Sequence, residues 1–274
     1  MSAIPTFKNF ETTLFPSGVF ELAFNRPHIL NALSEDTYRE WLEGIQFAAK
    51  DDRIKVVVLT GRGKYYSSGA ELRKTDFNTQ EGNQYDIRRR GITKSLVTAL
   101  IDFPKLLIAA VNGPSYGFAT TSLALCDVVY ASTDSNFTTP FMKLAFCAEA
   151  CSSYTFPKIM GTTRANEMLL MGRTISVAKH VQGGFVSRTF PKETIREEVL
   201  KIAEEAAQFS VEAIKATKKL VRDVDRDLLH QVNEEEMKQL HTQIRTPESI
   251  ASIASFVDAA EKRRAERKAN KSKL

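Results

Sequence analysis

Hydrophobic and polar residues alternate in two short segments close to the N-terminus. These segments are FETTLF, at 10–15, and VFELAF, at 19–24, and the turn-forming residues Pro16, Ser17 and Gly18 separate them. Alternation on both sides of a turn predicts a β-hairpin.

Helical spacing of apolar residues begins after Ser34, a residue type that caps helix N-termini. A second helix is predicted over 85–101, because Pro104 follows closely and the residue before a proline disfavours helix. The segment 73–83 between them has the weakest pattern and is predicted to be an irregular connection. The apolar positions of the first helix are Tyr38, Trp41, Leu42, Ile45, Ala48 and Ala49.

Three short runs are almost continuously apolar, namely IKVVVLTG, LLIAAVNG and CDVVYAS. Such runs are typical of strands that are covered on both faces by helices. After Gly161 the pattern becomes mainly helical. We therefore expect an α/β fold in which residues 1–200 form a core of strands and helices and residues 201–261 form a C-terminal helical region.

The remaining segment, residues 262–274, is a basic tail. It contains seven Lys or Arg and one Glu, a net charge of +6, and subtracting this from the +5 of the whole chain leaves −1 for the rest. A nucleic-acid surface needs basic residues spread over a folded face, so no nucleic-acid partner is expected. No apolar run approaches the roughly 18–20 residues that cross a bilayer, so no membrane span is expected either.

The last three residues are Ser272, Lys273 and Leu274. A terminal S-K-L tripeptide is an address that the peroxisomal import receptor reads. We therefore predict a peroxisomal location and the import receptor as a partner.

The three cysteines, Cys126, Cys147 and Cys151, lie in apolar stretches and are predicted to be free thiols. Cys147 and Cys151 are four residues apart, but no histidine is near them, so no metal site is expected.

Two loops and one acid are candidates for chemistry. Residues 67–72, SSGAEL, and 113–118, GPSYGF, each follow a buried strand, and their small residues let the backbone approach a ligand closely. Backbone N–H groups at such turns can hold a developing oxyanion. Glu149, between Ala148 and Ala150, is a carboxylate in an apolar setting, which suits the removal and return of a proton on carbon.

Four segments, NRPHILNAL, YYSSGAEL, VNGPSYGFATTSLALCDVVYAS and the stretch ending in KIMG, resemble the crotonase (enoyl-CoA hydratase/isomerase) superfamily in that order. The resemblance implies a crotonase-like spiral of strand–strand–helix (ββα) units, followed by a C-terminal helical region through which subunits trimerise. It also implies that the backbone N–H groups of Ala70 and Phe118 form an oxyanion hole for an acyl-CoA thioester.

Within this superfamily, the positions of the catalytic acids differ between hydratases and isomerases, and the resemblance therefore also bears on the reaction. Hydratases carry catalytic acids at the positions of Thr121 and Phe141, and both acids are absent here. Glu149 stands where the peroxisomal Δ3,Δ2-enoyl-CoA isomerases keep their one base, and Ala150 departs from the glycine that is common next to it. Burial against Phe118, Phe141 and Phe146 is expected to raise the pKa of Glu149.

The same resemblance implies that CoA phosphates contact Arg26, His28 and Lys64. CoA is part of the substrate, so no separate cofactor is expected, and the expected assembly is a homotrimer or homohexamer. The run Arg88–Arg90 is predicted to be a solvated helix face. Further substrate-binding residues implied by the resemblance are Ser68, Leu72, Gly117, Phe141 and Phe146.

Two alternatives stay open at this point. One is another acyl-CoA reaction of the superfamily, hydration or thioester hydrolysis, in which Glu149 activates water. The other is a scaffold that binds acyl-CoA without turning it over.

Overall fold

A computed structural model describes residues 3–271 of the chain, and it describes only the backbone for Arg264 and residues 267–271. The predicted targeting tripeptide, Ser272, Lys273 and Leu274, lies outside the described residues.

Most strands of the described chain join one mainly parallel sheet. Its order is β1-β2-β3-β4-β6-β9, in which β1 and β2 are antiparallel and every later neighbour is parallel. A smaller sheet has the order β5-β7-β8. The strands are β1 (Phe10–Leu14), β2 (Val19–Phe24), β3 (Val56–Gly61), β4 (Leu106–Val111), β5 (Ser115–Tyr116), β6 (Val128–Ser132), β7 (Asn136–Thr138), β8 (Thr174–Ser176) and β9 (Arg188–Phe190).

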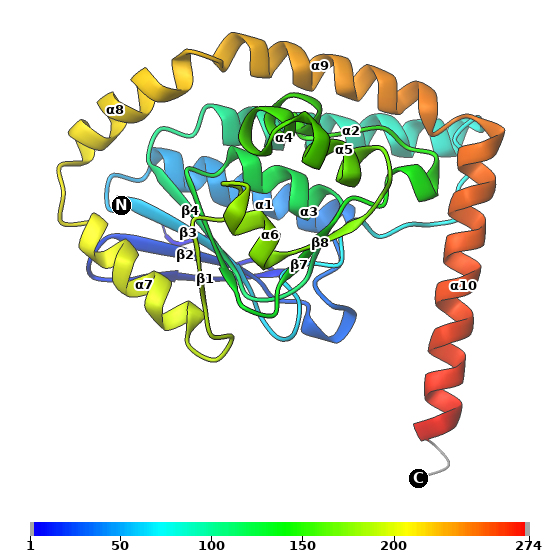
Figure 1. Cartoon of the computed structure of the whole chain (residues 1–274), viewed down its shortest axis with the longest axis horizontal. Coiled ribbons are helices and arrows are strands. Elements are labelled where there is room, and N and C mark those ends of the chain that lie inside the picture. Colours follow the sequence, from blue (N-terminus) through cyan, green and yellow to red (C-terminus); the bar gives the residue numbers. More distant parts are fainter. Residues whose placement is uncertain (1–2, 272–274) are drawn as a thin grey trace.

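Helices surround these sheets and make up most of the C-terminal part of the described chain (Figure 1). They are α1 (Glu35–Lys50), α2 (Gln80–Ile101), α3 (Phe118–Thr121), α4 (Ser152–Met160), α5 (Thr162–Leu169), α6 (Val177–Gln182), α7 (Ile195–Ala206), α8 (Val211–Asp223), α9 (Arg226–Gln243) and α10 (Pro247–Lys271).

The central strands are buried on both faces, as their continuous apolar runs predict. Every residue of β2 and β3 is buried. Side chains of one face, such as Leu22 and Leu59, join the main core with α1 and α2, whereas Val19 and Val58 on the other face pack against α7. The predicted hairpin is confirmed, because β1 pairs with β2 across a turn in which Gly18 has a φ of 88°.

The first helix starts where the sequence predicts it, and the second starts earlier than predicted. The Ser34 side chain accepts a hydrogen bond from the Thr37 N–H at 3.2 Å, so the predicted start of α1 is confirmed. Helix α2 begins earlier than predicted, at Gln80, because the Thr79 hydroxyl accepts the Gly82 N–H at 3.1 Å. The predicted irregular connection of residues 73–83 was therefore too long at its C-terminal end.

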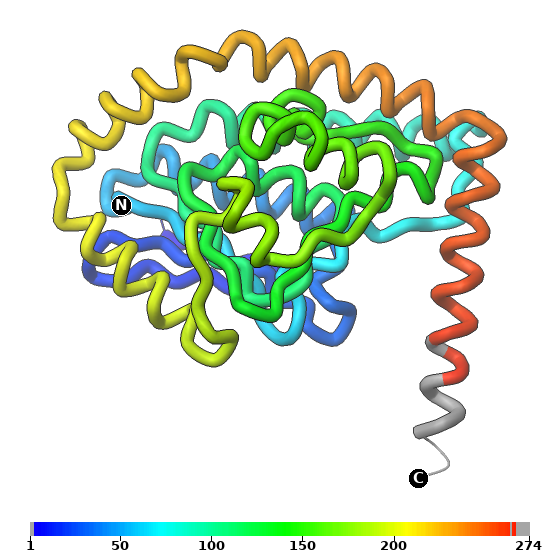
Figure 2. The backbone as a smooth tube through the Cα atoms, viewed as in Figure 1, coloured from blue at the N-terminus to red at the C-terminus, as the bar shows by residue number. Residues whose placement is uncertain are grey.

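The C-terminal helices run along the outside of the body. Figure 1 shows α8 and α9 arching over one edge and α10 extending away from the rest, and the backbone tube of Figure 2 follows the same path. Helix α10 is joined to the body near its start, where the Ser249 hydroxyl donates to the Leu144 carbonyl at 3.2 Å. Within the described chain, no helix is long and apolar enough to cross a membrane.

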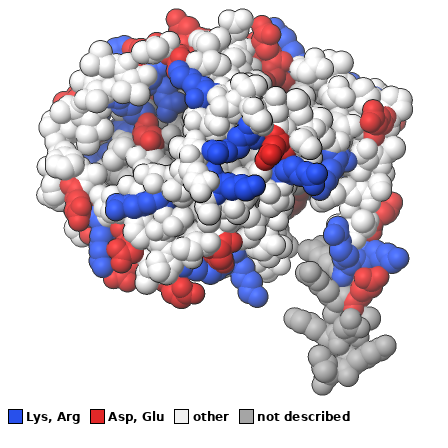
Figure 3. All heavy atoms as spheres, viewed as in Figure 1, with Lys and Arg blue, Asp and Glu red and all other residues white. Residues whose placement is uncertain are grey.

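Charged side chains of both signs are interspersed on the face of the body that Figure 3 displays. This distribution agrees with the nearly neutral body that remains when the basic tail is set aside.

Candidate active site

Glu149 lines a small cavity of about 70 Å³ between the loop that follows Ala70, α1, α2 and the C-terminal helices α9 and α10. An apolar cluster forms one wall, and Arg89 and the Tyr38 ring face the same space. The apolar members of the lining are Leu72, Phe77, Phe146, Leu240, Ile244 and Ile253.

The Glu149 carboxyl group has an unusual electrostatic setting. Burial raises its pKa from the ordinary 4.5 to about 7, the Arg89 guanidinium acts in the opposite direction, and the like charge of Glu236 raises it further. No hydrogen bond from a described residue reaches the carboxyl oxygens. The group therefore titrates near neutral pH, as a general base that also returns its proton must.

The backbone just after Glu149 adopts a rare conformation. Ala150 has a φ of 56° and Cys151 a φ of 61°, so two consecutive residues with side chains are left-handed. The Glu149 carbonyl accepts the Ser152 hydroxyl at 2.7 Å, and helix α4 starts immediately afterwards. This turn directs the Glu149 side chain into the cavity and the following helix away from it.

The two small-residue loops lie side by side, as their proposed chemistry requires. The Tyr116 N–H donates to the Ser67 carbonyl at 3.1 Å, and Ser67 and Ser115 form a parallel bridge. Gly69, with a φ of 81°, lies so close to this partner that a Cβ atom would be 2.8 Å from the Tyr116 carbonyl oxygen. Only glycine fits this approach without displacing the second loop.

Ala70 and Phe118 are the residues whose N–H groups this pairing leaves available. Ala70 bridges to Leu33, but the hydrogen bonds of that bridge use the Gly69 carbonyl and the Glu71 N–H. Phe118 is the first residue of α3, and the first N–H groups of a helix have no acceptor within it. Both N–H groups are free of acceptors among the described residues.

Aromatic packing supports the second loop from behind. The Phe118 ring makes edge contacts with Tyr38 at 5.0 Å and with Trp41 at 5.8 Å between ring centroids. The Arg89 guanidinium lies 5.7 Å from the centroid of the Tyr38 ring. Tyr38 thus connects the second small-residue loop to the cation beside Glu149.

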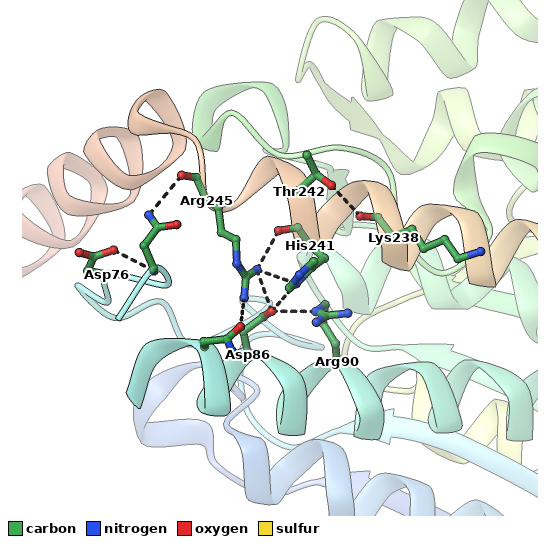
Figure 4. Close-up of polar contacts among 9 residues, drawn as sticks. Asp76, Asp86, Arg90, Lys238, His241, Thr242 and Arg245 are labelled. Carbon is green, nitrogen blue, oxygen red and sulfur yellow. Dashed lines mark hydrogen bonds and ion pairs between the residues drawn. The ribbon is translucent and has the colours of Figure 1, made fainter. Parts of the chain in front are cut away.

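A network of charged groups closes the cavity on the side of α2 and α9 (Figure 4). Asp86, which is 3% exposed, accepts two hydrogen bonds from the Arg90 Nε, at 3.0 and 2.9 Å. The second oxygen also lies 2.8 Å from the His241 Nδ1 and 2.9 Å from an Arg245 nitrogen. Asp86 is therefore saturated with donors, unlike Glu149.

Several residues predicted to bind substrate lie in or beside this cavity. Leu72 and Phe146 line it directly together with Ala70. Gly117, with a φ of 55°, is the N-cap of α3, and Ser68 is half-buried in the first loop.

Other predicted residues lie elsewhere. Phe141 is 2% exposed and packs in the main core, so the structure does not place it in the cavity. Arg26 is bound to the Glu71 carboxylate at 2.6 Å and to the Ala32 carbonyl, which braces the first loop. His28 and Lys64 are exposed at the surface.

Three residues that the sequence did not single out meet at Glu149. The sequence predicts a solvated helix face for the run Arg88–Arg90, and this prediction is wrong for Arg89 and Arg90, because both line the cavity and Arg90 pairs with the buried Asp86. The sequence predicts Tyr38 as an apolar position of the first helix and indicates no role for Glu236, although both interact electrostatically with Glu149. Their separation along the chain leaves no local pattern that could have indicated this meeting point.

The geometry agrees with what comparison of the whole chain finds. Residues 15–269 match the model of the enoyl-CoA hydratase/isomerase family, and the chain belongs to this family. A solved enoyl-CoA hydratase/isomerase from Pseudoalteromonas atlantica is 30% identical, with a TM-score of 0.82 over 92% of this chain and 98% of that one. The predicted crotonase-type α/β fold is confirmed.

Within this family, the chain is similar to proteins named enoyl-CoA delta isomerases. The chain is 39% identical to enoyl-CoA delta isomerase 2 of Rattus norvegicus over 88% of its length, and 36% identical to the peroxisomal enoyl-CoA delta isomerase 3 of Mus musculus over the same share. It spans 61% of the rat protein and 75% of the mouse protein.

Proposed function

We propose that the chain is an enoyl-CoA isomerase that moves the double bond of a cis- or trans-3-enoyl-CoA to the trans-2 position. Glu149 is the single acid and base, and the N–H groups of Ala70 and Phe118 hold the thioester oxygen. CoA is carried by the substrate, and no further cofactor takes part. The product is the form in which an unsaturated acyl chain can continue through β-oxidation.

The observation that carries this proposal is the contrast between the two carboxyl groups of the cavity. Asp86 is neutralised by cations, whereas Glu149 has no hydrogen-bond donor among the described residues and a pKa of about 7. A group that shuttles a proton must take up and release the same proton near neutral pH, so it needs the properties of Glu149 rather than those of Asp86.

The reaction follows from this arrangement in two proton transfers. The C2–H bond of a 3-enoyl thioester is acidified by the carbonyl and by the neighbouring double bond. Glu149 takes the C2 proton, and the electron pair spreads over C2, C3, C4 and the thioester oxygen as a dienolate. The two N–H donors stabilise the oxygen, and Glu149 returns the proton at C4, so that the double bond lies between C2 and C3.

The surroundings of Glu149 support isomerisation over hydration. Hydration requires a second group that activates or orients water, and the positions of the hydratase acids hold Thr121 and Phe141. Thr121 is fully buried, and its hydroxyl donates to the carbonyls of Gly117 and Phe118. The apolar wall around the cavity further disfavours the entry of water.

The proposal includes a peroxisomal location and a homotrimer or homohexamer. One relative is named peroxisomal, which supports the location. Helix α8 and the residue that caps its C-terminus expose Leu220, Val221 and Val224, each more than two-thirds accessible. Val221 lines a groove of about 740 Å³ that contains none of the proposed catalytic residues. An apolar surface of this kind is typical of a face that a further subunit covers.

The test is conversion of a medium-chain trans-3-enoyl-CoA, followed by the ultraviolet absorbance of the conjugated product. We expect turnover by the parent protein and a loss of about 100-fold or more in Glu149→Gln, with the exposed Glu235→Gln as the matched control. Equal rates for parent and Glu149→Gln would remove Glu149 as the base. Binding of the substrate without conversion by the parent would instead favour thioester hydrolysis, which release of free CoA detects, or a scaffold.

A further inference from the structure

Helix α4 begins directly after the turn that carries Glu149, and its N-terminus is capped in an unusual way. The N-cap residue is Cys151, whose side chain makes no capping hydrogen bond. The Glu236 carboxylate of α9 replaces it: Oε2 accepts the Cys151 N–H at 2.7 Å, and Oε1 accepts the Ser153 N–H at 2.9 Å. A residue 85 positions away in sequence therefore satisfies the free donors of this helix.

The same carboxylate is hydrogen-bonded to the strained turn at Ala150 and Cys151. Ala150 and Cys151 are both left-handed, a conformation that residues with a Cβ atom adopt only where the surroundings enforce it. Glu236 is 7% exposed and holds the second of these two residues through its N–H group. On the other side, the Ser152 N–H and hydroxyl both donate to the Glu149 carbonyl, at 3.2 and 2.7 Å.

We propose that Glu236 is a positioning residue for the reaction: from α9 it holds the left-handed turn Ala150–Cys151 and so aims Glu149 at the substrate. The inference rests on the function proposed above. It assigns to a helix of the C-terminal region a direct part in the geometry of the active site. The Glu149 side chain accepts no hydrogen bond from the residues that the structure describes, so its backbone must supply the order.

The negative charge of Glu236 also changes the pKa of Glu149. Two charges act on Glu149: the Arg89 guanidinium of α2 lowers its pKa, and Glu236 of α9 raises it. The other titratable groups that line the same cavity are Tyr38 of α1, Tyr85, Asp86 and Arg90 of α2, and Arg73 of the preceding loop. Cys147, on the same loop, has its own pKa raised by burial and by Glu149. Burial also raises the pKa of Glu236, and the negative charge of Glu236 raises the pKa of Glu149.

The decisive variant is Glu236→Gln, which keeps the shape of the side chain. A glutamine can accept one of the two N–H groups through its oxygen, but its NH2 group must face the other donor. We expect kcat to fall by roughly 10- to 100-fold while KM stays within about twofold, because a base displaced by a fraction of an ångström is penalised in the chemical step. Loss of the like charge should also move the acid limb of the kcat profile to lower pH. Glu235→Gln, one residue away and exposed, is the control.

A rescue variant separates positioning from simple helix capping. Glycine adopts the left-handed conformation without penalty, so Ala150→Gly removes part of the strain in the turn that Glu236 stabilises. The double variant Glu236→Gln/Ala150→Gly should recover at least a few-fold of the kcat lost in Glu236→Gln. If Glu236→Gln lowers only the melting temperature, or if Ala150→Gly restores nothing and the pH limb stays in place, Glu236 merely caps α4 and the proposal is overturned.

A spectroscopic titration keeps the inference separate from the proposed function. If the parent does not convert 3-enoyl-CoA, the proposed function fails, but the carboxyl carbon of Glu149 can still be followed by NMR against pH in the parent and in Glu236→Gln. A lower midpoint with a changed limiting chemical shift supports control of Glu149 by Glu236. An unchanged titration overturns it.

Discussion

Removal of the proposed base should make the protein more stable, and the gain should depend on pH. Glu149 is partly buried in a cavity where ionisation is unfavourable, so the folded state binds its proton more tightly than the unfolded chain does. Glu149→Gln keeps the size of the side chain and removes the charge. The variant should therefore lose activity and gain stability together, a trade-off that active sites often show.

The size of the gain follows from the pKa of Glu149. Its value of about 7 in place of 4.5 corresponds, at about 1.4 kcal/mol for each pKa unit, to about 3 kcal/mol that the parent loses when the carboxyl group is ionised. Below pH 4.5 the group is protonated in both the folded and the unfolded state, and this cost vanishes. Between pH 4.5 and 7 the unfolded chain ionises first, so the stability of the parent falls, and above pH 7 the full cost applies.

Urea denaturation at pH 4 and pH 8 measures this difference, with fluorescence of the chain's single tryptophan, the buried Trp41, as the signal. We expect Glu149→Gln to exceed the parent by about 3 kcal/mol in free energy of unfolding at pH 8 and by less than about 0.5 kcal/mol at pH 4. The exposed Glu235→Gln should show no such pH-dependent gain. Equal stability of parent and Glu149→Gln at pH 8 would refute the account of Glu149 as a desolvated carboxylate.

Three further perturbations have defined outcomes. Asp86→Asn should lower the free energy of unfolding at pH 7 by about 3–5 kcal/mol, because it leaves two partly buried guanidinium groups without their shared counter-ion; a loss below about 1 kcal/mol in urea denaturation would contradict this. Gly113→Ala should cost about 1–3 kcal/mol in the same assay, since its Cβ would lie 2.2 Å from the Lys64 carbonyl oxygen, and an unchanged midpoint would count against it. Arg89→Gln should move the acid limb of kcat/KM to higher pH, because the guanidinium favours ionised Glu149; a shift to lower pH would show that the sign is wrong.

Much of the framework was predictable because its signals are local. The hairpin of β1 and β2, the buried strands β3 and β4 and the cap of α1 each depend on residues within a few positions of one another. The pairing of the two small-residue loops was suggested by their composition, and the 2.8 Å approach at Gly69 explains why these residues are small.

The surroundings of Glu149 were not predictable in the same way. Arg89 and Arg90 belong to a run of three arginines that has the composition of a solvated surface, and their inward orientation depends on how α2 packs against α1 and α9. Asp86 lies in α2 and Arg245 follows α9, far away in sequence, but an oxygen of the Asp86 carboxylate lies 2.9 Å from a guanidinium nitrogen of Arg245. No periodicity within one helix indicates which charged residues meet across two.

The sequence by itself determined the fold class, the two small-residue loops and the position of Glu149 in an apolar segment, because each is encoded by neighbouring residues. The tertiary structure alone decided how that carboxylate behaves. Burial in the cavity, the opposing charge of Arg89 and the hydrogen bonds of Glu236 to the next turn all come from helices that meet only in the folded chain. The proton affinity of a group depends on every charge and dipole around it, so it is a property of the assembled site rather than of any segment.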